Sequence, residues 1–203
     1  MKPSENGLTL IQVFEQLRLS PYLDSAHIWT VGWGHALTTP AGQAIDADVF
    51  GTAKAHQLMI EAMQRIFGAQ TITREQADTA LAADMASHAT AISRMIAGDT
   101  TQAQFDALLS FGFNVGEGNF ASSSVKRLHN AGDRAIGEIS IHDLAAKSQA
   151  HASPNTMPLA FVAWSNSNHQ WSLGLFRRRV AELLVYSGWD AQKAFDLVEQ
   201  YNG

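Results

Sequence analysis

The segment over residues 102–114 constrains the fold of this chain more than any other. It has the pattern of one helix whose large apolar side chains occupy much of the circumference: Phe105, Leu108, Leu109, Phe111 and Phe113. A helix that is apolar nearly all round is a buried helix. The chain has 203 residues, of which 46% are hydrophobic and 16% charged. A compact chain of this size buries roughly 70% of its unfolded surface, so we expect a well-formed core.

The rest of the chain predicts a small mixed region followed by many helices. Apolar residues at helical spacing predict a helix over about 8–18, which Pro21 should end because proline cannot continue it. Strand-forming residues punctuated by glycines predict a hairpin or small sheet over 22–35. Further helices are expected over about 49–67, 73–97, 124–130, 133–147, 176–184 and after 189. The predicted fold class is α+β with helices predominant.

Composition excludes several classes of function. The chain contains no cysteine, which rules out disulfides, thiolate metal sites and cysteine nucleophiles. Its net charge of −5 argues against general electrostatic binding to nucleic acid or to an anionic membrane. The stretch Met1–Leu10 lacks the apolar core of a signal peptide, so we expect synthesis in the cytoplasm. We also expect no cofactor and a monomer.

Two carboxylates and a threonine in the first 30 residues carry the main chemical signal. Asp24 follows Glu15 by nine residues, and Thr30 follows Asp24 by six. Taken alone they mean little, because most carboxylates lie on solvated surfaces and a threonine in a strand often only packs. Their context from Phe14 onward reads F-E-Q-L-R-L-S-P-Y-L-D-S-A-H-I-W-T-V-G-W-G-H-A. This run resembles the phage-type lysozymes, or endolysins (glycoside hydrolase family 24, typified by the T-even phage lysozyme).

Three later segments are similar to the same family, in the same order. They are the Ile72–Ala77 run continuing to Asp84, the run over 104–116, and the arginine-rich run over 174–182. The resemblance covers most of residues 11–190 and implies a single lysozyme-like domain with two lobes. A small lobe over about 20–85 would hold the sheet and an extra helix over about 49–67. A larger helical lobe over about 86–203 would be joined to it by the helix over 8–18.

The resemblance implies that Glu15, Asp24 and Thr30 are catalytic. Glu15 would protonate the glycosidic oxygen, while Asp24 and Thr30 would position the attacking water, with inversion at the anomeric carbon. Two carboxylates in unlike surroundings can divide such roles between them. We expect Glu15 to be partly desolvated at the end of its apolar helix and Asp24 to be better solvated on the hairpin. An inverting enzyme requires carboxyl groups roughly 6.5–9.5 Å apart.

The resemblance also suggests residues that bind substrate, although each of them could have a purely structural role. Gly34, Asn114, Ser123 and Arg177 are candidates for substrate binding. For Asn114 the favoured alternative is a helix cap, and the arginine run 177–179 could be a solvated face. Successive helical residues turn by about 100°, so one of these arginines should point inward and pair with Glu15 or Asp24, and we favour Arg177.

His35 is expected to form a structural ion pair with Asp84. A metal role is the alternative, but the eight histidines form no motif with ligand spacing, so no metal site is predicted.

The predicted activity is hydrolysis of the β-1,4 bond between N-acetylmuramic acid and N-acetylglucosamine in peptidoglycan, serving bacterial cell lysis. The expected partner is therefore the peptidoglycan glycan strand, reached in the periplasm after release or delivery, without membrane insertion. Three alternatives stay open. The chain could be a delivered antibacterial effector or virion-associated hydrolase of the same fold, a non-catalytic peptidoglycan-binding domain, or a lytic transglycosylase.

Overall fold

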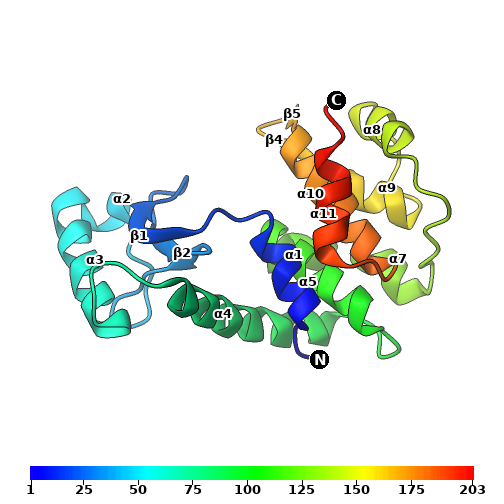
Figure 1. The fold of residues 1–203 in the computed structure, drawn as a ribbon. Helices are drawn as coiled ribbons and strands as arrows, with labels where there is room; N and C mark the ends of the chain where they lie inside the picture. The colour runs from blue at the N-terminus through cyan, green and yellow to red at the C-terminus, as the bar shows by residue number, and fades with distance from the viewer. The chain divides into compact units, whose positions relative to one another are not determined.

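A computed structural model describes residues 1–203, and Figure 1 shows the course of the chain. The chain divides into two compact units: a small unit of residues 15–84 and a large unit of residues 1–14 and 85–203. Helices predominate and the strands are few and short, so the predicted α+β class is confirmed. None of the helices has both the length and the apolar character needed to cross a membrane.

The bounds of the elements are as follows. The helices are α1 (Glu5–Gln12), α2 (Ala47–Phe50), α3 (Thr52–Phe67), α4 (Arg74–Met95), α5 (Gln102–Val115), α6 (Glu117–Ser122), α7 (Ser124–Ala131), α8 (Ile141–Gln149), α9 (Met157–Val162), α10 (Leu173–Tyr186) and α11 (Ala191–Glu199). The strands are β1 (Arg18–Leu23), β2 (Trp29–Gly32), β3 (His35–Ala36), β4 (Asn166–Ser167) and β5 (Gln170–Trp171).

The small unit is built on the antiparallel sheet β1-β2-β3. In its register Tyr22 lies opposite Thr30, and Thr30 lies opposite Ala36. The β2–β3 turn needs glycine at two positions, because Gly32 and Gly34 have φ angles of 70° and 97°. The small sheet predicted over 22–35 is therefore confirmed, and β1 begins earlier, at Arg18.

The predicted helix over 8–18 is wrong at both ends. Helix α1 begins four residues after the start of the chain, where the Ser4 hydroxyl accepts a hydrogen bond from the backbone N–H of Gly7. It ends at Gln12, so Glu15 lies in the connection to β1. Pro21 lies inside β1, an edge strand, where the absence of an N–H is tolerated. Only Arg18 of the predicted helix belongs to β1, and residues 13–17 form the connection between α1 and that strand.

Helices α2 and α3 and the first part of α4 follow the sheet in the small unit. The helix predicted over 49–67 is confirmed in part: Gly51, with a φ angle of 76°, separates the short α2 from α3. Helix α4 begins with a capping box, as the sequence Thr73-x-x-Gln76 predicts. The backbone N–H of Thr73 donates to the Gln76 side chain (2.9 Å), and the N–H of Gln76 donates to the Thr73 hydroxyl (3.2 Å).

Helix α5 is the buried centre of the large unit, as predicted. Phe105, Leu108, Leu109 and Phe111 are inaccessible to solvent, and α5 packs against α1 and α10. The Phe111 ring makes edge-to-face contacts with Phe120, Phe161 and Trp164. The helix predicted over 133–147 is only partly present, because α8 begins at Ile141. The polar sequence over 165–169 predicts a loop, but this segment contains β4 and the turn of the β4–β5 hairpin.

Candidate active site

Asp24 is a half-buried residue whose carboxylate organises the β1–β2 turn. Its Oδ1 accepts hydrogen bonds from the backbone N–H groups of Ala26 (2.8 Å) and Ile28 (2.9 Å). The Asp24 N–H in turn donates to the Ile28 carbonyl (3.0 Å). No hydrogen bond occupies the second carboxylate oxygen, Oδ2. Asp24 therefore has one oxygen committed to the backbone and one available for a ligand or a water.

Thr30 is linked to Asp24 through the same residue, Ile28. The Thr30 hydroxyl donates to the Ile28 carbonyl oxygen (3.0 Å), and Thr30 is 3% exposed. Because its hydrogen is committed to that carbonyl, the hydroxyl oxygen can only accept a further hydrogen bond. Asp24 therefore binds the N–H of Ile28 and Thr30 binds its carbonyl oxygen. Asp24 Oδ2 and Thr30 Oγ1 can each accept a further hydrogen bond.

Glu15 is half-buried and lies in the connection before β1. Glu15 and Asp24 both act electrostatically on the Tyr22 hydroxyl. Partial burial raises the pKa of Tyr22, the Arg18 guanidinium opposes that rise, and the carboxylates of Glu15 and Asp24 both reinforce it. The Arg18 guanidinium carbon lies 4.3 Å from the centre of the Tyr22 ring. The structure therefore brings both predicted carboxylates to the surroundings of one tyrosine.

The β2–β3 corner is fastened to α4 by two aspartates. The Trp33 ring nitrogen donates to Asp78 (2.7 Å), and His35 Nδ1 lies 2.9 Å from Asp84 Oδ2. The predicted contact between His35 and Asp84 is confirmed. Gly34, predicted to bind substrate, is an exposed turn residue with no side-chain neighbour near the position of a Cβ. No group of three His, Asp or Glu side chains in residues 1–203 is arranged to hold a metal ion.

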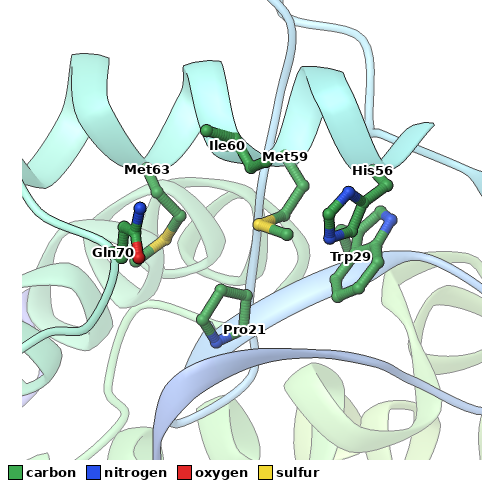
Figure 2. Close-up of a pocket in the computed structure, with 7 residues that line it drawn as sticks. All are labelled: Pro21, Trp29, His56, Met59, Ile60, Met63 and Gln70. Carbon is green, nitrogen blue, oxygen red and sulfur yellow. The ribbon is translucent and has the colours of Figure 1, made fainter. Parts of the chain in front are cut away.

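A pocket of about 350 Å³ lies between α3 and the strands, and Figure 2 shows the side chains that line it. Met59 and Met63 project from α3 toward Pro21 of β1, and the His56 ring lies next to Trp29 of β2. Successive residues of a strand point to opposite faces, so this pocket lies on the other face of β2 from the Thr30 side chain. None of the predicted site residues lines it.

In the large unit, Arg177 and Ser123, two of the predicted binding residues, form hydrogen bonds within the protein. The Arg177 guanidinium donates to Glu199 (2.9 Å) and to the Tyr201 carbonyl (2.8 Å), near the end of the chain. The expectation that Arg177 is the inward-pointing arginine is wrong. Ser123 is 3% exposed and acts as the N-cap of α7, because its hydroxyl accepts from the N–H of Lys126 and donates to the Phe120 carbonyl.

The inward-pointing arginines are Arg178 and Arg179, and both contact the carboxylate of Glu182. Arg179 Nη2 lies 3.0 Å and Arg178 Nε 3.4 Å from Glu182 Oε1, which also accepts from the Ser110 hydroxyl (2.9 Å). Glu182 and Arg179 are inaccessible to solvent.

Burial sets the protonation behaviour of this ion pair. It raises the pKa of Glu182 against the attraction of the two arginines, and it lowers the pKa of Arg179 to about 10 against the attraction of Glu182. Sequence reasoning did not predict this cluster, although the spacing of three and four residues between the arginines and Glu182 is a usable signal.

Asn114 is an exposed residue in the last turn of α5, and it makes no capping bond. Its side-chain oxygen Oδ1 instead accepts a hydrogen bond from Arg179 Nη2 (2.8 Å). The alternative of a helix cap is therefore wrong for Asn114. Arg179 links a buried carboxylate to an amide on the surface.

Comparison with known proteins assigns the family. Residues 12–142 match the family model "Phage lysozyme". The endolysin of Acyrthosiphon pisum secondary endosymbiont phage 1 is 33% identical over 133 residues, which cover 66% of this chain and 73% of that protein. The endolysin of Bacillus phage B103 is 26% identical over 190 residues, 92% of this chain but 54% of that protein. This chain therefore spans about half the length of that relative.

A solved structure agrees with the family match. A crystal structure of a P22 lysozyme variant superposes with a TM-score of 0.60 at 26% identity, covering 93% of this chain and 99% of the other. This similarity extends over nearly all of both chains. Because the family model matches more than half of the sequence, the chain belongs to the phage lysozyme family and is a lysozyme.

Proposed function

We propose that this lysozyme hydrolyses the β-1,4 bond between N-acetylmuramic acid and N-acetylglucosamine, with Glu15 as the general acid. Asp24 and Thr30 would hold the attacking water. The observation that carries the proposal is the shared attachment of Asp24 and Thr30 to Ile28, which leaves one acceptor oxygen on each side chain. Peptidoglycan at the bacterial cell wall would be the site of action.

The free acceptor oxygens of Asp24 and Thr30 can bind the two hydrogens of a water molecule whose oxygen attacks carbon. A water that donates one hydrogen to Asp24 Oδ2 and the other to Thr30 Oγ1 keeps its oxygen free to attack the anomeric carbon. Asp24 takes the proton as the new C–O bond forms, and Glu15 protonates the departing oxygen. Attack from the face opposite the leaving group inverts the anomeric carbon.

The hydrogen bonds of Asp24 suit the role of holding the water. Asp24 receives two backbone N–H donors, which interact most favourably with an ionised carboxylate. Glu15 is half-buried in a connecting segment. Two carboxylates can divide the roles of base and acid between them.

A comparison of wild type with Glu15→Gln on purified peptidoglycan tests this proposal. The amide keeps the size of the side chain but cannot supply a proton, so we expect the rate of bond cleavage to fall about 100-fold or more. Glu61→Gln is the matched control, because Glu61 is an exposed residue of α3 bonded only to Gln57. Its rate should equal that of wild type.

The products identify the reaction. Reducing N-acetylmuramic ends with the inverted anomer formed first would support the mechanism, whereas anhydro ends would indicate a lytic transglycosylase. Equal rates for wild type and Glu15→Gln would refute the role of Glu15. Retained binding to sacculi without any cleavage by wild type would favour a non-catalytic binding domain.

A further inference from the structure

The pocket between α3 and the strands lies entirely within the small unit, and none of the proposed catalytic residues lines it. Its volume of about 350 Å³ falls in the range of roughly 300–1,000 Å³ that is usual for small-molecule sites. Most of its lining is apolar, and the side chains that can form hydrogen bonds are those of Trp29, His56 and Gln70. Water inside it would therefore have few protein partners, so an apolar ligand that displaced this water would be favoured.

The Trp29 indole N–H has no hydrogen-bond acceptor, although its Nε1 atom is buried. Two other tryptophans of the chain do have one: Trp33 donates to Asp78 (2.7 Å) and Trp171 donates to Ser148 (3.2 Å). An indole nitrogen is a donor only, so an acceptor atom alone can satisfy it. Leaving a buried donor unpaired is unfavourable, and a ligand that brought an acceptor to Nε1 would remove that penalty.

The His56 ring lies against the indole and is free to move. The centres of the two rings are 5.8 Å apart at an interplanar angle of 59°, and Figure 2 shows His56 beside the edge of Trp29 that carries the nitrogen. His56 is an exposed residue of α3, and no hydrogen bond or ion pair holds its ring. Exposed side chains change rotamer within picoseconds to nanoseconds. A ligand in the pocket can therefore reach Nε1 once the His56 ring swings aside, without the loss of a polar contact.

We propose that this pocket binds a small molecule that has an apolar body and one carbonyl oxygen, which accepts the Trp29 N–H. Met59 and Met63 would contact the apolar body, and methionine adapts to ligands of different shape because its side chain is flexible and polarisable. A sugar fits this lining poorly, since most of its hydroxyl groups would be buried without partners.

This site is separate from the proposed catalytic face. Trp29 and Thr30 are successive residues of β2, so their side chains point to opposite faces of the sheet. A ligand against Trp29 would therefore not contact Thr30. The inference adds a ligand to the small unit and does not depend on the proposed function.

Acetophenone and α-methylstyrene are a matched pair of probes, because they have nearly the same shape and a methylene group replaces the carbonyl oxygen in the second. Each probe is titrated into the full ¹⁵N-labelled chain, and the indole N–H signals of its five tryptophans are followed by NMR. The signal that is absent from Trp29→Phe belongs to Trp29. We expect acetophenone to move this signal further downfield than α-methylstyrene does, because only acetophenone accepts a hydrogen bond.

The same titrations measure the part of the affinity that comes from the hydrogen bond. The Trp29→Phe substitution changes the apolar contacts of both probes but removes a donor that only acetophenone can use. We therefore expect the Kd of acetophenone, relative to that of α-methylstyrene, to rise about fivefold in Trp29→Phe. An unchanged ratio, or equal downfield shifts with the two probes, would overturn the inference.

Two isoleucines of α3 provide the matched variants that locate the probe. Ile60 lines the pocket and is 37% exposed, whereas Ile66 lies outside it and is 38% exposed. Ile60→Glu should weaken acetophenone binding about 10-fold, because it places a charge beside an apolar ligand. Ile66→Glu should leave the Kd within about twofold, and a melting curve checks that both variants fold.

Two further outcomes would contradict the site. Equal effects of Ile60→Glu and Ile66→Glu would show that acetophenone binds elsewhere on the chain. Competition between acetophenone and soluble glycan strands would show that the pocket belongs to the substrate-binding surface, whereas we expect the two to bind independently. Because no arm measures cleavage, a chain that failed to cleave peptidoglycan would refute the proposed function and leave this test intact.

Discussion

The two units hold carboxylates in opposite ways. In the small unit, Asp24 lies at a strand turn, bound by backbone N–H groups of the next few residues, with one oxygen unoccupied. In the large unit, Glu182 is inaccessible to solvent and is bound by side chains, two of them arginines. Asp24 is held by its own turn, whereas Glu182 depends on the packing of α10 against α5.

The two ways of holding a carboxylate suit different roles: one suits binding and catalysis, and the other affects the stability of the fold. A carboxylate anchored by local backbone can keep an oxygen for a ligand, because the turn and not the ligand satisfies its other oxygen. Burying a carboxylate in a core costs desolvation free energy, which its charged partners offset. Removing one partner is therefore destabilising. We therefore expect substitutions at Asp24 to change activity and substitutions at Glu182 to change stability.

The largest expected effect is on activity at Asp24. In Asp24→Asn the amide oxygen can still accept from Ala26 and Ile28, so the turn is kept, but the negative charge that orients the water is lost. We expect the rate on peptidoglycan to fall about 10²- to 10⁴-fold, with the melting temperature nearly unchanged. If the melting temperature fell while the rate did not, Asp24 would serve stability and not activity, which would contradict this prediction.

Asp46→Asn provides the matched control for Asp24→Asn. The Asp46 carboxylate also accepts two backbone N–H bonds, from Asp48 and Val49, and also belongs to the small unit. Its substitution should leave the rate within about twofold of wild type, as is usual for a residue outside the chemistry.

The next effect is on the stability of the large unit. Glu182→Gln keeps the hydrogen-bond geometry but leaves the buried Arg179 without a carboxylate partner. We expect a loss of about 3 kcal/mol in the free energy of unfolding, measured with urea. Glu199→Gln is the control, since its partner Arg177 is only partly buried and the pair should contribute less than about 1 kcal/mol. Equal losses for the two variants would remove the distinction between buried and exposed pairs.

The smallest effect is a pH dependence in the large unit. His129 is inaccessible to solvent, between the Thr100 hydroxyl at Nε2 (2.8 Å) and the Tyr186 hydroxyl at Nδ1 (2.7 Å). Burial, reinforced by the positive charge of Arg134 and opposed by Asp99, lowers the pKa of His129 to about 4. The unfolded chain, with a histidine pKa of about 6.5, binds the proton more readily, so stability is lost as the pH falls from about 6.5 to 4.

We expect this histidine to contribute about 2 kcal/mol to the loss of stability between pH 7 and pH 5. The measurement is urea unfolding at both pH values for wild type and His129→Gln, and the difference between the two losses isolates the contribution of His129. His142→Gln, a change at an exposed histidine of the same unit, should show the wild-type dependence. An unchanged loss in His129→Gln would exclude His129 as the cause.

Local patterns predicted much of the fold. The buried α5, the capping box at Thr73 and the sheet around Trp29 were all readable from the sequence, because each depends on residues within a few positions of one another. The helix expected over 8–18 was wrong at both ends: α1 spans Glu5–Gln12, and the chain then turns and enters β1 at Arg18, whose pairing with β2 no local pattern encodes. Glu15 is half-buried in the connection between α1 and β1 and does not lie on a helix.

The sequence by itself determined the residue types and spacing of Glu15, Asp24 and Thr30, and the resemblance that they support. Only the tertiary structure decided which arginines are buried and which way the Asn114 amide points. The physical reason is the separation of the partners along the chain: Arg179 and Asn114 are 65 residues apart, and His129 and Tyr186 are 57 apart. The periodicity of the sequence predicts which face of a helix is buried. Which side chains contact that face depends on how the helices pack.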